Sequence, residues 1–195
     1  MLATSAKSWG GFLLEEQMDG IPDLEAMGRR IMIMGPSNSG KSTLTEAIGR
    51  KLEIEPVYLD LLRHLPNTDW VQRTDADFQR LHDGAIQAHS WIMEGNYSVL
   101  LPQRLARATG IIIIGDHHLR RYWRYFRRTL FSKKRPGGME GNIDSVKWEM
   151  VRWIWVSRNS NAKYEAAARA AGLPHVFCRS LQEVKAVYAA WGLMP

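Results

Sequence analysis

The sequence predicts an α/β fold in which a parallel sheet is covered by helices on both faces, giving three layers. The first observation behind this prediction is that five short apolar segments alternate with segments of helical periodicity from Arg29 onward. The second is that these apolar segments are continuous, which is typical of strands buried on both faces. The third is composition: 45% hydrophobic and 24% charged residues in a chain of 195 fit one globular domain.

The five apolar segments are expected to be strands, because each is too short for a helix and ends at glycine or a polar residue. They comprise residues 31–34, 56–59, 91–93, 111–114 and 175–178. The residues that follow or end them are Gly35, Asp60, Glu94, Asp116 and Arg179. Ligands of parallel sheets bind beyond the carboxyl ends of the strands. These residues are therefore the first candidates for a functional site.

The segments between the strands are expected to be helices, because their apolar residues recur at helical spacing. They cover residues 42–52, 75–88, 101–108, 119–131 and about 144–171. The inward faces of the first two consist of Leu44, Ile48 and Leu52, and of Phe78, Leu81, Ala85 and Ile86. The residues Ser180-Leu181-Gln182-Glu183 form a capping box that opens a last helix.

One domain is expected over residues 29–195, preceded by an extension. Residues 1–28 are interrupted by Gly10-Gly11, Gly20 and Pro22, so this extension is expected to be partly flexible. No apolar run approaches the roughly 18 residues that a membrane span needs. Cys178 is the single cysteine, which excludes an internal disulfide framework. Because no secretory pattern precedes the domain either, we expect a cytoplasmic protein without a membrane partner.

The positive charge of the chain is concentrated in one segment. The net charge is +6, yet residues 119–135 alone hold eight of the 26 cations and no acidic residue, which leaves 18 cations against 20 anions elsewhere. Arg120, Arg124, Arg127 and Arg128 recur on one face of the helix expected there. A segment of this kind favours an anionic ligand, although a solvated basic helix is the alternative. The glycines at 137 and 138 make residues 119–142 a candidate helical lid.

Residues 35–42 match the phosphate-binding pattern G-x-x-x-x-G-K-[ST] and lie between an expected strand and an expected helix. In such a loop, glycines permit the turn and backbone amides surround phosphate oxygens at the positive end of the helix. The predicted phosphate-binding residues are Gly35, Ser37, Asn38, Ser39, Gly40, Lys41, Ser42 and Thr43. Lys41 is also a catalytic candidate, because its charge would lie between the transferred phosphoryl group and its leaving group. The Ser42 hydroxyl is a candidate Mg²⁺ ligand.

Two carboxylates are candidates to complete a Mg²⁺ site with Ser42. We favour Glu94, because its strand is expected beside the loop strand, and Asp116 is the second candidate. Asp60 is a catalytic candidate that would orient or deprotonate an acceptor hydroxyl, with a simple turn residue as the alternative. Asn96 and Tyr97 follow a glycine at a strand end and are candidates to contact the acceptor.

Phosphoryl transfer needs cations around the transferred group, delivered as the site closes. Arg124 and Arg128 in the lid segment are catalytic candidates for this role, and Arg158 is expected to reach the group from the other side.

The sequence from Ile31 to about Val187 resembles the bacterial adenylate-kinase-like P-loop proteins that are often labelled topology modulation proteins. The matching pieces are the loop with its strand, Tyr58-Leu59-Asp60, Trp91-Ile92-Met93-Glu94-Gly95-Asn96-Tyr97, the arginine-rich helix, Trp153-Ile154-Trp155 with Arg158, and Arg179-Ser180 with Glu183-Val184. The resemblance implies a nucleoside-monophosphate-kinase-like fold with strand order 2-3-1-4-5, ATP with Mg²⁺, and phosphotransferase activity. It also implies that Glu94 helps to hold Mg²⁺, where the family usually has aspartate, and that Arg179 lies against adenine.

Three functions remain open at this stage. The first is a kinase that moves the ATP γ-phosphoryl group to a small-molecule acceptor, for example a nucleotide. The second is an ATP-binding regulatory or nucleic-acid-associated protein with weak or no kinase activity, whose basic helix would bind a phosphodiester backbone. The third is a polynucleotide kinase. We favour the first, with nucleic acid as a secondary partner.

Overall fold

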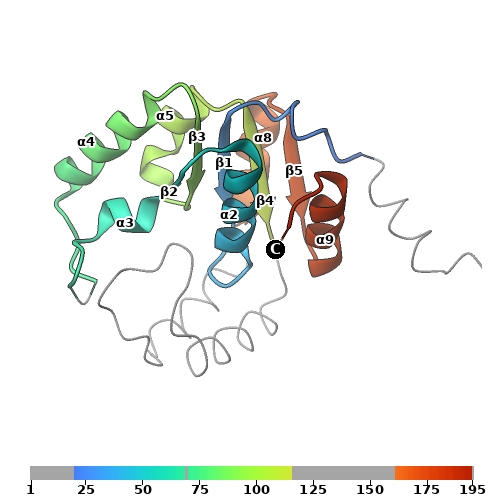
Figure 1. The fold of residues 1–195 in the computed structure, drawn as a ribbon. Coiled ribbons are helices and arrows are strands. Elements are labelled where there is room, and N and C mark those ends of the chain that lie inside the picture. The colour runs from blue at the N-terminus through green and yellow to red at the C-terminus, as the bar shows by residue number, and fades with distance from the viewer. Residues whose placement is uncertain (1–19, 69, 116–160, 195) are drawn as a thin grey trace, which may run out of the picture.

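The computed structural model describes residues 20–68, 70–115 and 161–194. Its centre is a five-stranded parallel sheet with the strand order β2-β3-β1-β4-β5 (Figure 1). The strands are β1 (Arg30–Met34), β2 (Pro56–Tyr58), β3 (Trp91–Glu94), β4 (Gly110–Ile114) and β5 (His175–Cys178). The predicted fold class and strand order are confirmed.

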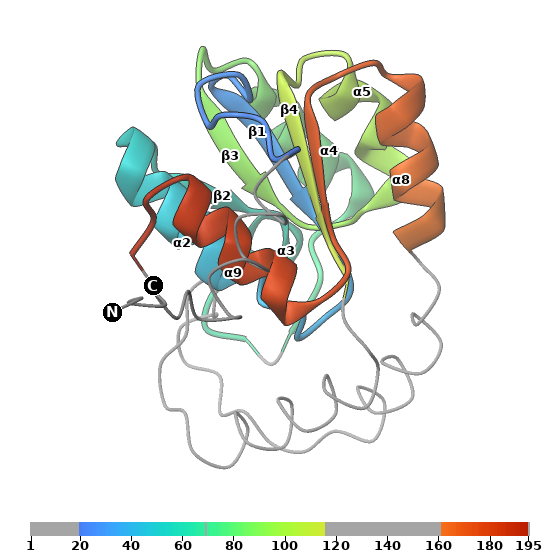
Figure 2. The ribbon, with the colours of Figure 1, turned by 90° about the vertical axis from the view of Figure 1, so that its right-hand side faces the viewer.

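Helices cover both faces of this sheet and give three layers (Figure 2). One face packs against α2 (Lys41–Leu52) and α9 (Leu181–Ala190), and the other against α4 (Asp75–Ile86), α5 (Leu101–Leu105) and α8 (Asn161–Ala170). Ile31 and Ile33 of β1 belong to the first core, whereas Met32 and Met34 belong to the second. The alternation of side chains along a strand therefore explains why the apolar segments are continuous.

Two expected elements end earlier than their sequence pattern indicates. The strand expected over residues 56–59 ends at Tyr58, and the helix α3 (Leu59–Arg63) begins at once, so Asp60 lies in the first turn of a helix. The register explains the difference, because Tyr58 pairs with Glu94, the last residue of β3. The helix expected over residues 101–108 is found as α5, which begins at Leu101 and ends at Leu105, and the 3₁₀ turn η1 (Ser98–Leu100) precedes it.

Residues 20–28 pack against the domain. Leu24 and Met27 are buried in the core between the sheet, α2 and α9, and the indole N–H of Trp191 donates a hydrogen bond to the Pro22 carbonyl at 2.8 Å. Residues 1–19 lie outside the described residues, as does most of the helix expected over 144–171, of which α8 is the described part. No helix in the described parts of the chain is long and apolar enough to span a membrane.

The inward face of α4 includes a histidine that the sequence pattern does not single out. Phe78, His82 and Ile86 are its buried residues, while Leu81 is half-buried. The His82 ring is fully buried, and its Nδ1 lies 2.9 Å from an Asp83 carboxylate oxygen. Its Nε2 has no hydrogen-bond partner among the described residues. Burial lowers the pKa of His82, the charge of Arg104 lowers it further, and Asp83 opposes both effects.

The buried neutral His82 predicts that the fold loses stability in mild acid. Below its ordinary pKa of 6.5 the unfolded chain takes up a proton that the folded chain does not, so the free energy of unfolding falls as pH falls. Between pH 7.5 and 5.5, urea titrations should show the wild type losing about 1 kcal/mol more than His82→Gln. His89→Gln, at an exposed position, should retain the wild-type pH dependence. Equal slopes for the wild type and His82→Gln would contradict the prediction.

Candidate active site

The phosphate loop predicted over residues 35–42 connects β1 to α2 at the carboxyl edge of the sheet (Figure 1). Gly35 turns the chain away from β1 with φ of 140°. A Cβ atom at this position would lie 2.0 Å from the Ile114 carbonyl oxygen at the end of β4. Only glycine can take this backbone conformation so close to the neighbouring strand. The turn is therefore fixed by the packing of β1 against β4.

The N-terminus of α2 is open toward an anion. Gly40 occupies its N-cap position with φ of 98°, makes no side-chain cap, and is followed by a first turn without acidic residues. The amide groups of such a helix end carry partial positive charge and need acceptors. The Ser39 hydroxyl and the Asn38 amide nitrogen in the preceding loop are buried without a hydrogen-bond partner among the described residues. These donors suit the oxygens of a phosphate group.

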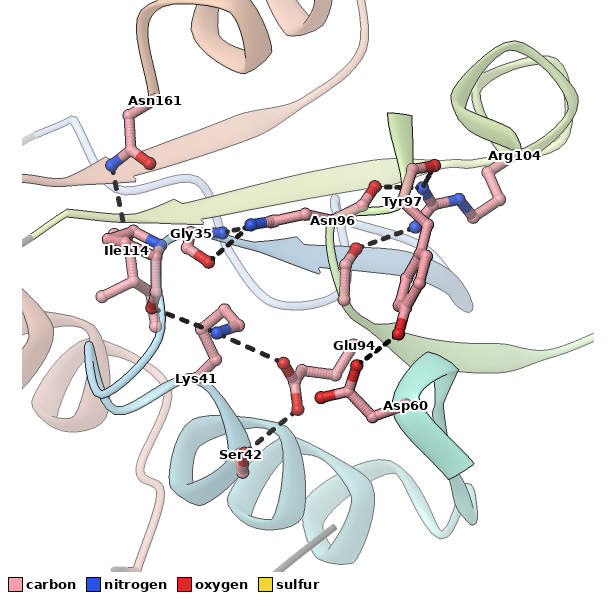
Figure 3. A network of polar contacts seen from close by, with 12 residues as sticks. Gly35, Lys41, Ser42, Asp60, Glu94, Asn96, Tyr97, Arg104, Ile114 and Asn161 are labelled. Carbon is pink, nitrogen blue, oxygen red and sulfur yellow. Dashed lines mark hydrogen bonds and ion pairs between the residues drawn. The ribbon is translucent and has the colours of Figure 1, made fainter. Parts of the chain in front are cut away.

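Lys41, Ser42 and Glu94 meet at the start of α2 (Figure 3). The Ser42 hydroxyl donates to one Glu94 carboxylate oxygen at 3.0 Å, and the Lys41 ammonium lies 3.4 Å from the other. Lys41 also donates to the Pro36 carbonyl at 3.2 Å. The side chains of Lys41 and Glu94 are only 12% and 11% exposed. The structure therefore joins Glu94 to Ser42, whereas Asp116 lies outside the described residues.

A hydroxyl beside a carboxylate fits Mg²⁺, which prefers hard oxygen ligands and keeps several water molecules. The described residues contain no group of three or more His, Cys, Asp or Glu side chains that could hold a metal ion. This donor set suits an ion that is held by Ser42, Glu94 and phosphate oxygens, and it does not suit zinc.

The loop that follows β3 braces the phosphate loop. The Asn96 side chain accepts a hydrogen bond from the Gly35 amide and donates one to the Gly35 carbonyl, both at 3.0 Å. Gly95 has φ of 137°, and a Cβ atom there would lie 2.8 Å from the Leu59 side chain. Asn96, which the sequence offered as an acceptor contact, therefore contacts the phosphate loop.

Arg104 of α5 binds the backbone of this loop. It is not identified as a site residue from the sequence. Its guanidinium is fully buried and donates to the carbonyls of Gly95, Asn96 and Tyr97 at 2.9, 2.5 and 3.0 Å. Burial lowers the pKa of Arg104 to about 10, so the group remains charged at neutral pH. The sequence does not indicate that Arg104 binds this loop. Its partners are backbone carbonyls, which every residue has, so no particular residue type signals the contact.

Asp60 is joined to the same loop. The Tyr97 phenol donates a hydrogen bond to one Asp60 carboxylate oxygen at 2.7 Å (Figure 3). Burial raises the pKa of Tyr97, and the charge of Asp60 raises it further. Asp60 itself is exposed at the start of α3. The described structure thus brings Lys41, Ser42, Glu94 and Asp60 to one end of the sheet, through Glu94 at the end of β3 and Tyr97 in the loop that follows it.

The remaining predicted residues fall into three groups. Ser37 lies in the phosphate loop and Thr43 is exposed in the first turn of α2. The Arg179 backbone lies beside Gly115, but its guanidinium pairs with Glu165 of α8 at 2.8 Å and is 65% exposed, so its role at adenine stays a prediction. Arg124, Arg128 and Arg158 lie outside the described residues, together with Asp116 and the lid segment.

Comparisons with known proteins give matches only among solved structures. No protein-family model matches the chain, and no curated protein sequence does. A shikimate kinase from Bacteroides thetaiotaomicron is 18% identical with a TM-score of 0.49, over 83% of this chain and 95% of that chain. A gluconokinase from Sinorhizobium meliloti is 17% identical with a TM-score of 0.40, over 72% and 97%. A sugar kinase from Janibacter is 11% identical with a TM-score of 0.37, over 73% and 97%.

The close approach at Gly35 predicts that Gly35→Ala destabilises the fold. The added methyl group must push β4 away from the loop or distort the turn, and we expect a loss of about 3 kcal/mol in the free energy of unfolding. Gly84→Ala is the matched control, because no described atom lies within 4 Å of a Cβ atom there. Since Gly84 lies inside α4, that change should stabilise by up to about 1 kcal/mol. Urea unfolding of both variants measures the difference, and a Gly35→Ala protein as stable as the wild type would refute this account of the turn.

Proposed function

We propose that this protein is an ATP-dependent kinase that transfers the γ-phosphoryl group of ATP to a small-molecule acceptor. The observation that carries the proposal is that the end of β3 and the loop after it contact both the phosphate loop and Asp60. Glu94 at the start of this loop meets Lys41 and Ser42 of the phosphate loop, and Tyr97 three residues later holds Asp60. A phosphate-binding end and a carboxylate suited to an acceptor hydroxyl are thus held at one edge of the sheet.

The phosphate loop supplies binding and charge stabilisation in this proposal. The amide groups at the N-terminus of α2 and the Ser39 and Asn38 side chains bind phosphate oxygens. Lys41 exchanges the Pro36 carbonyl for the γ-phosphoryl group and its leaving oxygen. Ser42 and Glu94 would hold Mg²⁺, which when bound neutralises negative charge on the phosphates. Asp116 is the second candidate ligand.

Asp60 acts on the acceptor. As the acceptor oxygen bonds to the γ-phosphorus, the bond from that phosphorus to the β–γ bridging oxygen breaks and ADP leaves. The proton of the acceptor hydroxyl passes to Asp60. Arg124, Arg128 and Arg158 are proposed to stabilise the charge on the transferred group, and Arg179 to lie against adenine, on the grounds that the sequence gives.

An alternative function is an ATP-binding regulator that associates with nucleic acid and hydrolyses ATP slowly or not at all. The observation that favours it is the segment 119–135, with eight cations and no anion. Binding through such a segment to a phosphodiester backbone would weaken steeply with salt.

The deciding experiment is transfer from γ-labelled ATP with Mg²⁺ across a panel of acceptors. The panel contains nucleoside monophosphates, nucleosides, sugars, hydroxylated ring acids, and short RNA and DNA ends. We expect one class of small molecule to become labelled. ATP binding without any labelled product, together with salt-sensitive binding of nucleic acid, would favour the alternative.

Lys41→Ala is expected to lower kcat by at least about 100-fold, because one preorganised charge on the transferred group is lost. The fold should persist, since the hydrogen bond and ion pair of the Lys41 side chain among the described residues are to the Pro36 carbonyl and to Glu94. Lys51→Ala, at the exposed end of the same helix, is the control and should retain wild-type turnover. A Lys41→Ala enzyme with an unchanged rate would remove the loop from the mechanism.

Asp60→Asn is expected to separate transfer from ATP binding. Loss of the proton acceptor should lower transfer by about 100-fold or more, while the Kd for ATP stays within about threefold, because no described contact joins Asp60 directly to the phosphate loop. Transfer rates and equilibrium ATP binding measure the two effects. Equal losses in both would assign Asp60 a structural role.

A further inference from the structure

We infer that Tyr97 is a positioning residue for the phosphoryl transfer, which sets the place of the Asp60 carboxylate relative to the phosphate loop. The inference rests on the proposed function, because it concerns how Asp60 meets the acceptor. Tyr97 would not touch the reacting atoms. It would act through the hydrogen bond that its phenol donates to Asp60 at 2.7 Å.

Asp60 needs such a partner because its own helix does not fix it. The carboxylate is exposed in the first turn of α3, a helix of only five residues whose N-cap residue, Tyr58, makes no side-chain cap. A free aspartate in this position would sample several rotamers. The phenol engages one carboxylate oxygen and leaves the other for the acceptor hydroxyl. The hydrogen bond therefore selects one orientation of the group proposed to take the proton.

Tyr97 is itself held firmly enough to serve as a reference point. Its ring packs edge-on against Phe78 with 4.9 Å between centroids, and its carbonyl accepts a hydrogen bond from buried Arg104 at 3.0 Å. Its backbone has φ of 26°, a value that residues other than glycine rarely adopt. Such a conformation costs energy and persists only where the surrounding contacts impose it. Here Arg104 bonds to the carbonyls of the loop, and the Asn96 side chain bonds to the Gly35 backbone.

The loop transmits the position of the phosphate loop to Asp60. Asn96, the residue before Tyr97, makes two hydrogen bonds to the Gly35 backbone, and Glu94 contacts Ser42. Asn96 and Tyr97 are neighbours in the chain. Asn96 bonds to Gly35 of the phosphate loop and Tyr97 bonds to Asp60, so these two residues link the phosphate loop to the Asp60 carboxylate (Figure 3). Because the Tyr97 pKa is raised, the phenol keeps its proton during turnover and remains a donor to Asp60.

The chain offers a matched control for the loss of one phenol hydroxyl. Tyr58 also donates its hydroxyl to a carboxylate, that of Glu46 on α2, and burial likewise raises the Tyr58 pKa. This pair belongs to the packing of β2 against α2 and has no direct contact with Asp60 among the described residues. Tyr58→Phe therefore removes the same chemical group from a tyrosine whose hydroxyl bonds to Glu46 and not to Asp60.

The test compares Tyr97→Phe with Tyr58→Phe in the labelled-ATP assay, with the best acceptor of the panel. We expect Tyr97→Phe to lower kcat by about tenfold, the usual effect of losing one hydrogen bond to a charged group. The Kd for ATP and the KM for ATP should stay within about twofold, because the Asn96 contacts with Gly35 remain. Tyr58→Phe should leave kcat within about twofold of the wild type, even where both variants lose similar thermal stability.

A double-mutant cycle with Asp60→Asn then separates positioning from general support of the fold. If Tyr97 acts through Asp60, Tyr97→Phe has no further effect on kcat in the Asp60→Asn background. An unchanged kcat in Tyr97→Phe alone, or an equal loss in both backgrounds, overturns the inference. If turnover of Asp60→Asn is too slow to measure, the comparison with Tyr58→Phe decides, and equal kcat values for the two tyrosine variants overturn it.

The outcome also distinguishes the inference from the proposed function. A wild type that labels no acceptor overturns the kinase proposal and this inference with it. A wild type that labels an acceptor at an equal rate with and without the Tyr97 hydroxyl overturns the inference alone.

Discussion

The guanidinium of Arg104 donates hydrogen bonds to three successive carbonyls beneath the end of β3, and the contacts of the candidate site depend on the loop that these bonds hold. Among the described residues this fully buried cation has no carboxylate partner, and burying such a charge is costly. The carbonyl dipoles must therefore offset its lost hydration. Burial is the main cause of the lowered pKa of nearby His82, and the charge of Arg104 lowers that pKa further against the opposing effect of Asp83. Removing Arg104 would free the loop and leave its carbonyls unpaired.

The strand order brings the other parts of the site to this loop. Because β1 lies between β3 and β4, the phosphate loop that leaves β1 has a neighbouring strand end on each side. On one side the Ile114 carbonyl leaves room only for a glycine, and on the other Asn96 binds the backbone of that same glycine. The first residue of the loop is thus fixed from both sides. The parallel sheet makes this possible, because the carboxyl ends of β3, β1 and β4 lie side by side at one edge.

Sequence reasoning succeeds where the signal is local and fails where it depends on a distant partner. The isoleucine run of β4 and the phosphate-loop motif are each recognisable from consecutive residues alone. The strands, the loop and the helix after it could therefore be predicted. Glu94 lies beside Ser42, as the expected position of its strand next to β1 indicates, and its role toward Mg²⁺ stays a prediction. The hydrogen bond from Tyr97 to Asp60 and the burial of Arg104 and His82 could not be predicted. Each depends on how separate segments meet in space, and neither carbonyl acceptors nor a buried charge produces a periodic pattern.

Of the five described residues other than glycine that have positive φ, two lie in the site. Asn67 and Trp70 have positive φ in the segment between α3 and α4. Glu53 also has positive φ, but it caps the C-terminus of α2, where such a conformation is ordinary. Asn38 and Tyr97 adopt positive φ within the two loops of the site. Lys41 and Glu94 form an ion pair, and Lys41 also donates a hydrogen bond to the Pro36 carbonyl. In the proposed kinase, Lys41 would turn to a phosphate and Glu94 to its cation. Each of these two side chains would thereby exchange one oppositely charged partner for another, which offsets the electrostatic cost of separating the Lys41–Glu94 pair.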